Sequence, residues 1–108
     1  DILVLEGVPI EGDIMCSLEN CMAEQITLRN YRLPVVRVDT LLADKQYLSL
    51  EIIDCTVHDI VVPKVSDDRL CRVSFKRCSF FKDSPILNSL ERCIRSNLTI
   101  TYSDCRID

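Results

Sequence analysis

The stretch that decides the fold is "LSLEIIDCTV", residues Leu48 to Val57. Apolar side chains alternate at Leu50 and Ile52, Cys55 follows, and Val57 resumes the apolar pattern. Alternation with a period of two predicts a short strand with one buried face. Cys55 stands where such a strand would turn away from its sheet. Taken alone, it is a candidate nucleophile, metal ligand, disulfide partner or structural residue.

The same pattern occurs five times along the chain. The copies are Leu3-Leu5-Val8-Ile10, Ile26-Leu28-Tyr31-Leu33, Leu50-Ile52-Cys55-Val57, Val73-Phe75-Cys78-Phe80 and Ile100-Tyr102-Cys105-Ile107. Their third members stand at positions 8, 31, 55, 78 and 105, so the spacings are 23, 24, 23 and 27 residues. Self-similarity at such a period is typical of repeat architectures, in which each repeat buries its apolar face against its neighbours.

The pattern resembles the leucine-rich repeat, L-x-x-L-x-L-x-x-N/C-x-L, whose turn position takes either Asn or Cys. The first leucine of that motif matches at Leu70 and, as a tyrosine, at Tyr47, and it fails at Ala23 and Asn97. The resemblance covers the whole chain. It implies an α/β leucine-rich-repeat solenoid with five short parallel strands near residues 3–5, 26–28, 50–52, 73–75 and 100–102. A right-handed parallel β-helix is the structural alternative.

The segments that return from one strand to the next are predicted to be mixed. Ser84 and Pro85 begin a helix in "DSPILNSLERCIRSN", residues 83–97. "VDTLLADKQ", residues 38–46, predicts a short helix, and Glu11 to Met22 a turn or two of helix. In contrast, Pro63 and the β-branched residues of "HDIVVPKVSDDR", residues 58–69, predict an extended or irregular return.

The seven cysteines divide into two groups. Cys55, Cys78 and Cys105 occupy the turn position, where a thiol is expected to point inward, pack as a small hydrophobe and have a raised pKa. The other four are disulfide candidates, and their three possible pairings stay open: Cys16, Cys21, Cys71 and Cys93. Neither "CSLENC" nor "CTVH" has a second pair at zinc-finger spacing, so no metal site is expected.

The length predicts one domain over residues 1–108. No capping segment is recognisable at either end, so the domain is expected to be a segment of a larger solenoid or to have its ends covered by a partner. The basic residues are scattered and the net charge is −4, which argues against nucleic acid as a partner. No apolar run approaches the roughly 18 residues of a membrane span. His58 follows Cys55 by three residues and is expected to be a solvated surface residue. No paired carboxylates, triad or phosphate loop are present, so neither catalysis nor a cofactor is expected.

Residues between the inward positions are predicted to face the concave side of the sheet. The binding candidates on that face are Glu6, Arg29, Glu51, Ile53, Lys76, Thr101 and Ser103. One column of the face would place two cations, Arg29 and Lys76, around an exposed Ile53, an apolar centre with a polar rim. The alternative is a solvated face with charge pairs such as Arg29 with Glu6 or Glu51.

Two functions follow from the resemblance. The first is an extracellular or secreted recognition module of receptor or adhesion type that binds a protein ligand. The cysteine count and the glycosylation sequon at Asn97 favour it. The second is a cytoplasmic adaptor with reduced cysteines, similar to F-box substrate receptors, which the turn-position cysteines favour. Further repeats of the same protein, or self-association through uncapped ends, are expected partners.

Overall fold

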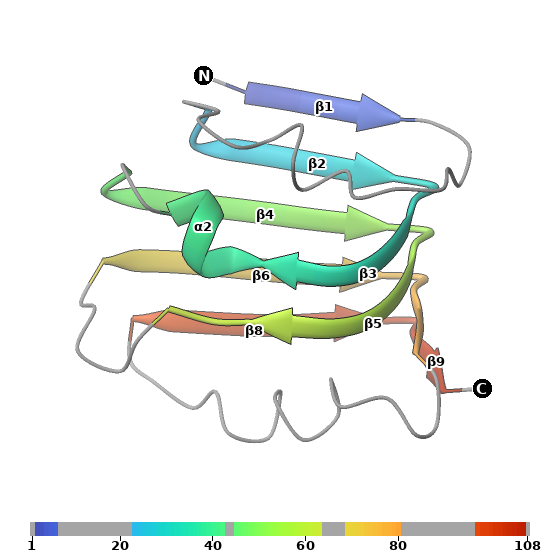
Figure 1. Cartoon of the computed structure of the whole chain (residues 1–108). Helices are drawn as coiled ribbons and strands as arrows, with labels where there is room; N and C mark the ends of the chain where they lie inside the picture. Colours follow the sequence, from blue (N-terminus) through green and yellow to red (C-terminus); the bar gives the residue numbers. More distant parts are fainter. Residues whose placement is uncertain (1, 7–22, 43–44, 64–68, 81–96, 108) are drawn as a thin grey trace.

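The computed structural model of the chain describes residues 2–6, 23–42, 45–63, 69–80 and 97–107. Two parallel β-sheets contain most of these residues (Figure 1). The five-stranded sheet has the order β1 (Ile2–Glu6), β2 (Gln25–Arg29), β4 (Tyr47–Ile53), β6 (Leu70–Lys76) and β8 (Leu98–Ser103). The four-stranded sheet has the order β3 (Arg32–Arg37), β5 (Thr56–Val61), β7 (Ser79–Phe80) and β9 (Arg106–Ile107). Within the described ranges, the helical content is α2 (Val38–Leu42).

The five strands predicted from the repeat are confirmed, and they form the five-stranded sheet. Each pairs in parallel with the strand of the next repeat. The register is the one that the repeat alignment predicts, because Leu28 pairs with Ile52, Ile52 with Phe75, and Phe75 with Tyr102. Strand alternation therefore determined both the position and the register of this sheet.

The four-stranded sheet changes part of the expected pattern of mixed returns. β5 agrees with the extended or irregular return predicted for residues 58–69, whereas the strands at residues 32–37, 79–80 and 106–107 were not predicted. Residues 32–37, 56–61, 79–80 and 106–107 are strands, and they pair in parallel from one repeat to the next. β-Branched residues are frequent here, as in "TVHDIV" of β5, and they suit a pleated surface. The short helix predicted in residues 38–46 is present as α2. The helices predicted in residues 83–97 and 11–22 fall almost entirely outside the described residues.

A tight corner joins the two sheets in each of four repeats. Asn30, Asp54, Arg77 and Asp104 have φ of 61°, 54°, 50° and 55°, and each directly precedes the turn position. This left-handed conformation is uncommon for residues other than glycine, although Asn and Asp tolerate it. Backbone bonds link successive corners, as from the Asp54 N–H to the Lys76 carbonyl at 2.9 Å.

The corner residues of two neighbouring repeats, Asp54 and Arg77, form an ion pair. Arg77 Nε donates to Asp54 Oδ1 at 2.8 Å, and Arg77 Nη2 donates to Asp54 Oδ2 at 3.1 Å. This bidentate hydrogen bond to Arg77 lowers the pKa of the Asp54 carboxyl. Both side chains are solvated, so the pair contributes little to stability.

We expect Asp54→Asn to lower the melting temperature at pH 7 by no more than about 2 °C. Asparagine tolerates the left-handed corner but carries no charge. Because the folded-state pKa of Asp54 is lowered, its contribution is complete above the unfolded-state pKa and lost as the pH falls. Calorimetry from pH 7 downward should therefore show the difference between wild type and variant narrowing as the pH falls below the unfolded-state pKa of Asp54; a difference that does not change with pH contradicts the role given to the charge.

The core lies between the two sheets. Leu28, Ile52 and Phe75 face it from the five-stranded sheet, and each is 0% exposed. Val57 and Phe80 face them from the four-stranded sheet. The rings of Phe75 and Phe80 meet edge to face, with centroids 5.5 Å apart and an interplanar angle of 82°. Burial of this apolar layer is the main stabilising contribution to the fold.

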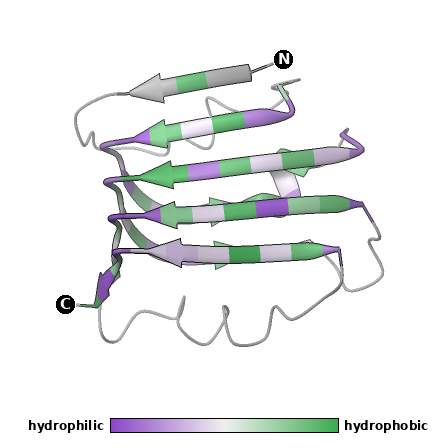
Figure 2. Cartoon of the chain, turned by 180° about the vertical axis from the view of Figure 1, so that it is seen from behind, coloured by the Kyte–Doolittle hydropathy of each residue, from purple (hydrophilic) through white to green (hydrophobic). Residues whose placement is uncertain are grey.

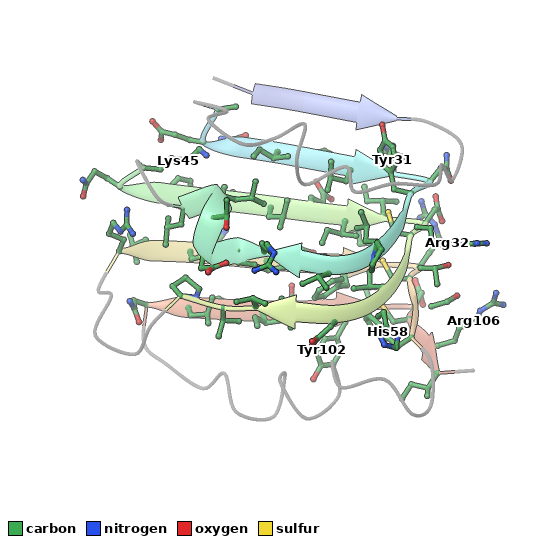
Figure 3. The ribbon with its side chains drawn as sticks, in the orientation of Figure 1. Tyr31, Arg32, Lys45, His58, Tyr102 and Arg106 are labelled. Carbon is green, nitrogen blue, oxygen red and sulfur yellow. The ribbon has the colours of Figure 1, made fainter. Side chains whose placement is uncertain are left out.

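The helix α2 closes one side of the core, and its C-terminal end is capped by two basic residues. Val38, Leu41 and Leu42 are its buried positions. Lys45, which is 6% exposed, donates from Nζ to the Leu41 carbonyl (Figure 3). Arg69 Nη1 donates to the carbonyls of Leu42 at 2.9 Å and Lys45 at 2.8 Å. These bonds satisfy carbonyls that the short helix leaves without internal partners.

Candidate functional site

The outer face of the five-stranded sheet is the surface on which the sequence placed its binding candidates. The register aligns them in two columns, Val4-Thr27-Glu51-Ser74-Thr101 and Glu6-Arg29-Ile53-Lys76-Ser103. Neighbouring strands are about 4.8 Å apart, so each column is a row of closely spaced side chains. Figure 2 views this side of the molecule, where no other described element lies over the strands.

Charge on the outer face is mixed and locally paired. Lys76 Nζ lies 2.8 Å from Glu51 Oε1, and the two side chains are 48% and 35% exposed. They are diagonal neighbours, because Glu51 pairs in register with Ser74, two residues before Lys76. The charge pairs predicted from the sequence were Arg29 with Glu6 or Glu51. Glu51 pairs with Lys76, and Glu6, the register neighbour of Arg29, has a side chain outside the described part of the structure.

Ile53 requires a correction, since it was expected to be an exposed apolar centre. The structure buries it, with 4% of its surface exposed, although it is not part of the core cluster between the sheets. In the register it stands between Arg29 and Lys76. Ile53 therefore offers little of its own surface to a ligand.

A third column of side chains on this face was not predicted from the sequence. It consists of Gln25, Ser49, Arg72 and Thr99, which pair successively in register. Arg72 is exposed in its middle, and Leu70, two residues earlier, is 59% exposed. The repeat pattern predicts strands of three residues, whereas β4 and β6 each have seven. Extending the alternation two residues upstream would have identified this column.

The turn cysteines form a ladder of thiols along the corner. The Sγ atom of each lies within hydrogen-bonding distance of two carbonyls, one at the end of the strand just before it and one in the neighbouring strand of the preceding repeat. Cys55 Sγ lies 3.2 Å from the Ile53 carbonyl oxygen and 3.7 Å from that of Leu28. Cys78 Sγ lies 3.4 Å from the Lys76 carbonyl oxygen and 3.2 Å from that of Ile52. Cys105 Sγ lies 3.6 Å from the Ser103 carbonyl oxygen and 3.5 Å from that of Phe75. Cys55 is 2% exposed and Cys78 0%, whereas Cys105 is half-buried.

Burial determines the chemistry of these thiols. It raises the pKa of Cys55, and it raises the pKa of Cys78 to about 12. A thiol that stays protonated and points into a core is a poor nucleophile. His58 lies exposed on β5, in the other sheet (Figure 3). The arrangement of Cys55 and His58 therefore offers no activated nucleophile.

The disulfide and glycosylation candidates lie partly outside the described residues. Cys71 is 4% exposed within the core, and its candidate partners Cys16, Cys21 and Cys93 fall in the segments that are not described. Its pairing stays a prediction. Asn97 is half-buried, and its Nδ2, the atom that would carry a glycan, donates to the Arg69 carbonyl at 3.2 Å. A glycan would leave one amide hydrogen for this bond.

No family model matches the chain, and no curated protein or solved structure matches it either. In the part of the chain that the structure describes, no helix has the length and hydropathy needed to cross a membrane. In the same part, His, Cys, Asp and Glu side chains form no group of three or more that would hold a metal ion. The geometry of the outer face is therefore the basis for a functional proposal.

Proposed function

We propose that this chain is a non-catalytic recognition module, an α/β leucine-rich-repeat solenoid that binds a protein ligand on the outer face of its five-stranded sheet. This proposal is supported by the agreement between the repeat spacing in the sequence and the strand register in the structure. Strands recur at the repeat spacing, and a thiol at each of three turn positions donates to backbone carbonyls. This is the position at which the leucine-rich-repeat motif takes Asn or Cys.

The observation that carries the proposal is the in-register array on the outer face. Three columns of outward side chains cross the sheet, and small polar residues such as Ser49, Ser74 and Thr27 separate the charged ones. Such a broad, ordered array suits the surface of a protein, and repeat proteins use extended sheet surfaces for this purpose. A small molecule would instead need a concave pocket that encloses most of its surface.

The charges of the face point to an acidic ligand surface. Arg29, Arg72 and Lys76 supply three cations, and Glu51 already engages Lys76. Arginine is favoured at interfaces because its planar guanidinium binds carboxylates in a bidentate manner. We therefore assign Arg29 and Arg72 as the principal ligand contacts, with Lys76 and Glu51 at their side.

The test compares two charge-reversal variants with equal changes in net charge. Arg29→Glu with Arg72→Glu alters the outer face, and Arg32→Glu with Arg37→Glu alters exposed positions of β3 in the other sheet. Ligands captured by the wild-type chain are identified by quantitative mass spectrometry, purified and titrated against all three proteins. The outer-face variant should bind at least about tenfold more weakly, and the β3 variant should bind like wild type. Equal ligand binding by both variants would exclude the outer face as the binding surface.

Two locations are proposed for the protein, one extracellular and one intracellular. The proposed extracellular module, of receptor or adhesion type, is supported by the number of cysteines and the sequon at Asn97. A specific observation favours the second candidate, an intracellular adaptor with reduced cysteines, because Cys55, Cys78 and Cys105 are free thiols. Mass spectrometry of the unreduced protein separates them. Two disulfides or a glycan on Asn97 support the first, and seven alkylatable thiols support the second.

A further inference from the structure

The surroundings of Arg72 on the outer face are rich in hydroxyl groups. In the register, Arg72 of β6 lies directly between Ser49 of β4 and Thr99 of β8. Ser74 follows Arg72 by two residues on the same side of β6, and its register partner on β8 is Thr101. Arg72 is exposed and Ser74 is half-buried, so a ligand on this face can reach both side chains.

The carboxylate nearest to this group in the register is engaged elsewhere. Glu51 pairs in register with Ser74, which places it diagonal to both Arg72 and Lys76. Its carboxylate engages Lys76, with 2.8 Å between Oε1 and Nζ. Glu51 also lies on β4, whereas β8, on the other side of β6, has no charged side chain. An anion that binds Arg72 from the β8 side therefore meets hydroxyl groups and avoids the Glu51 carboxylate.

Arg72, Ser74, Thr99 and Thr101 form the corners of a rectangle on the sheet. Its sides are about 4.8 Å between strands and about 6.6 Å along a strand, so its centre lies about 4 Å from each corner. One small anion at the centre can contact the guanidinium and the hydroxyls around it. A phosphate monoester has up to two negative charges and three acceptor oxygens, and it binds arginine in a bidentate manner. A carboxylate has two oxygens, which the guanidinium alone can bind.

We propose that a phosphoserine or phosphothreonine of the protein ligand binds at this rectangle of Arg72, Ser74, Thr99 and Thr101. The inference rests on the proposed function, because it assigns one chemical group of the ligand to a place on the outer face. Arg72 provides the charge-assisted hydrogen bonds, and the hydroxyls distinguish phosphate from carboxylate. Ligand binding then depends on a group that a kinase adds to the ligand and a phosphatase removes.

The test titrates the full chain with N-acetylphosphoserine methylamide and N-acetylglutamate methylamide, followed by amide chemical shifts. The phosphoserine probe should bind at least about tenfold more tightly than the glutamate probe and shift the amides of residues 72, 74, 99 and 101. Thr99→Val with Thr101→Val should weaken phosphoserine binding about fivefold and leave glutamate binding unchanged. Thr27→Val is the control, since Thr27 of β2 lies in the register column of Thr101 but outside the rectangle. Ser74→Ala repeats the comparison if the double variant does not fold.

A captured ligand separates this phosphate site from the proposed function. Phosphatase treatment of the ligand should weaken its binding to the wild-type chain at least about tenfold. If the treated ligand binds as before, while Arg29→Glu with Arg72→Glu still prevents binding, the phosphate site is overturned and the protein-binding face stands. If that double variant binds the ligand like wild type, both are overturned. Equal affinity for the phosphoserine and glutamate probes also overturns the phosphate site.

Discussion

Phe75→Ala is expected to lower the free energy of unfolding by about 3–5 kcal/mol, the range for deleting a buried phenylalanine side chain. Phe75 is fully buried, stands between Ile52 and Tyr102 in the register, and packs edge to face on Phe80. The substitution removes most of its apolar burial and leaves a cavity between the two sheets, which the strands can fill only in part. Urea denaturation followed by circular dichroism measures the loss.

The matched control is Tyr102→Ala in the same register column. Tyr102 is 61% exposed, so its removal should cost no more than about 1 kcal/mol when measured at concentrations where the chain is monomeric. The contrast between the two aromatic residues follows from burial alone, because both face the same side of the sheet. Equal destabilisation by both substitutions would contradict the exposed position of the Tyr102 side chain.

Cys78 is expected to react with iodoacetamide about a thousandfold more slowly in the folded chain than in the unfolded one at pH 8. Burial raises the pKa of Cys78 from 9.0 to about 12, and only the thiolate reacts. Three pH units correspond to about a thousandfold smaller thiolate fraction, and steric exclusion slows the reaction further. Peptide mass spectrometry across a time course, with and without urea, measures the two rates.

Cys105 is the internal control for this experiment, since it is half-buried and should react faster than Cys78 in the folded chain. The same shift affects stability. Because the folded-state pKa of Cys78 is raised, its contribution is complete below about pH 9, where the unfolded thiol is also protonated, and is lost as the pH rises towards 12. Equal modification of Cys78 and Cys105 would contradict the inward placement of the Cys78 thiol.

The five-stranded sheet was predictable because its signal is short-range and repeated. Leu50 and Ile52 alternate with polar residues, and the same alternation recurs around Phe75 and Tyr102. One copy would have indicated a strand, and several copies at constant spacing also determined the register. Cys55 was assigned to the corner for the same reason, since its equivalents stand at the same distance from each strand.

The four-stranded sheet was harder to predict because its pattern is not a simple alternation. In β3 the buried residues are Leu33 and Val36, and in β5 they are Val57 and Ile60, each pair three residues apart. The register passes over Pro34, which has no N–H for the ladder. A spacing of three indicates neither an ordinary strand nor a full helix turn. The β-branched residues of β5 indicate an extended segment, and the match between successive repeats reveals the other segments as strands.

The outer face was predictable in its columns but not in its exposure. Alternation determines that Ile53 points to the same side as Glu51, and the structure agrees in register. Its 4% exposure depends on how the surrounding side chains lie, and the sequence does not contain that information. The lesson for repeat sheets is that a strand pattern identifies a face, while the lengths of neighbouring side chains determine which residues a ligand can touch.

The tight corner has a consequence for how such a chain tolerates changes in length. In all four described repeats the passage from one sheet to the other takes two residues, as at Asp54-Cys55 and Arg77-Cys78. The repeats nonetheless differ in length, from 23 to 27 residues. Their variation is therefore accommodated on the opposite side, between the four-stranded sheet and the next repeat. Foreign peptides are best inserted there. Even one residue added in a corner would change the position of every outward side chain that follows it.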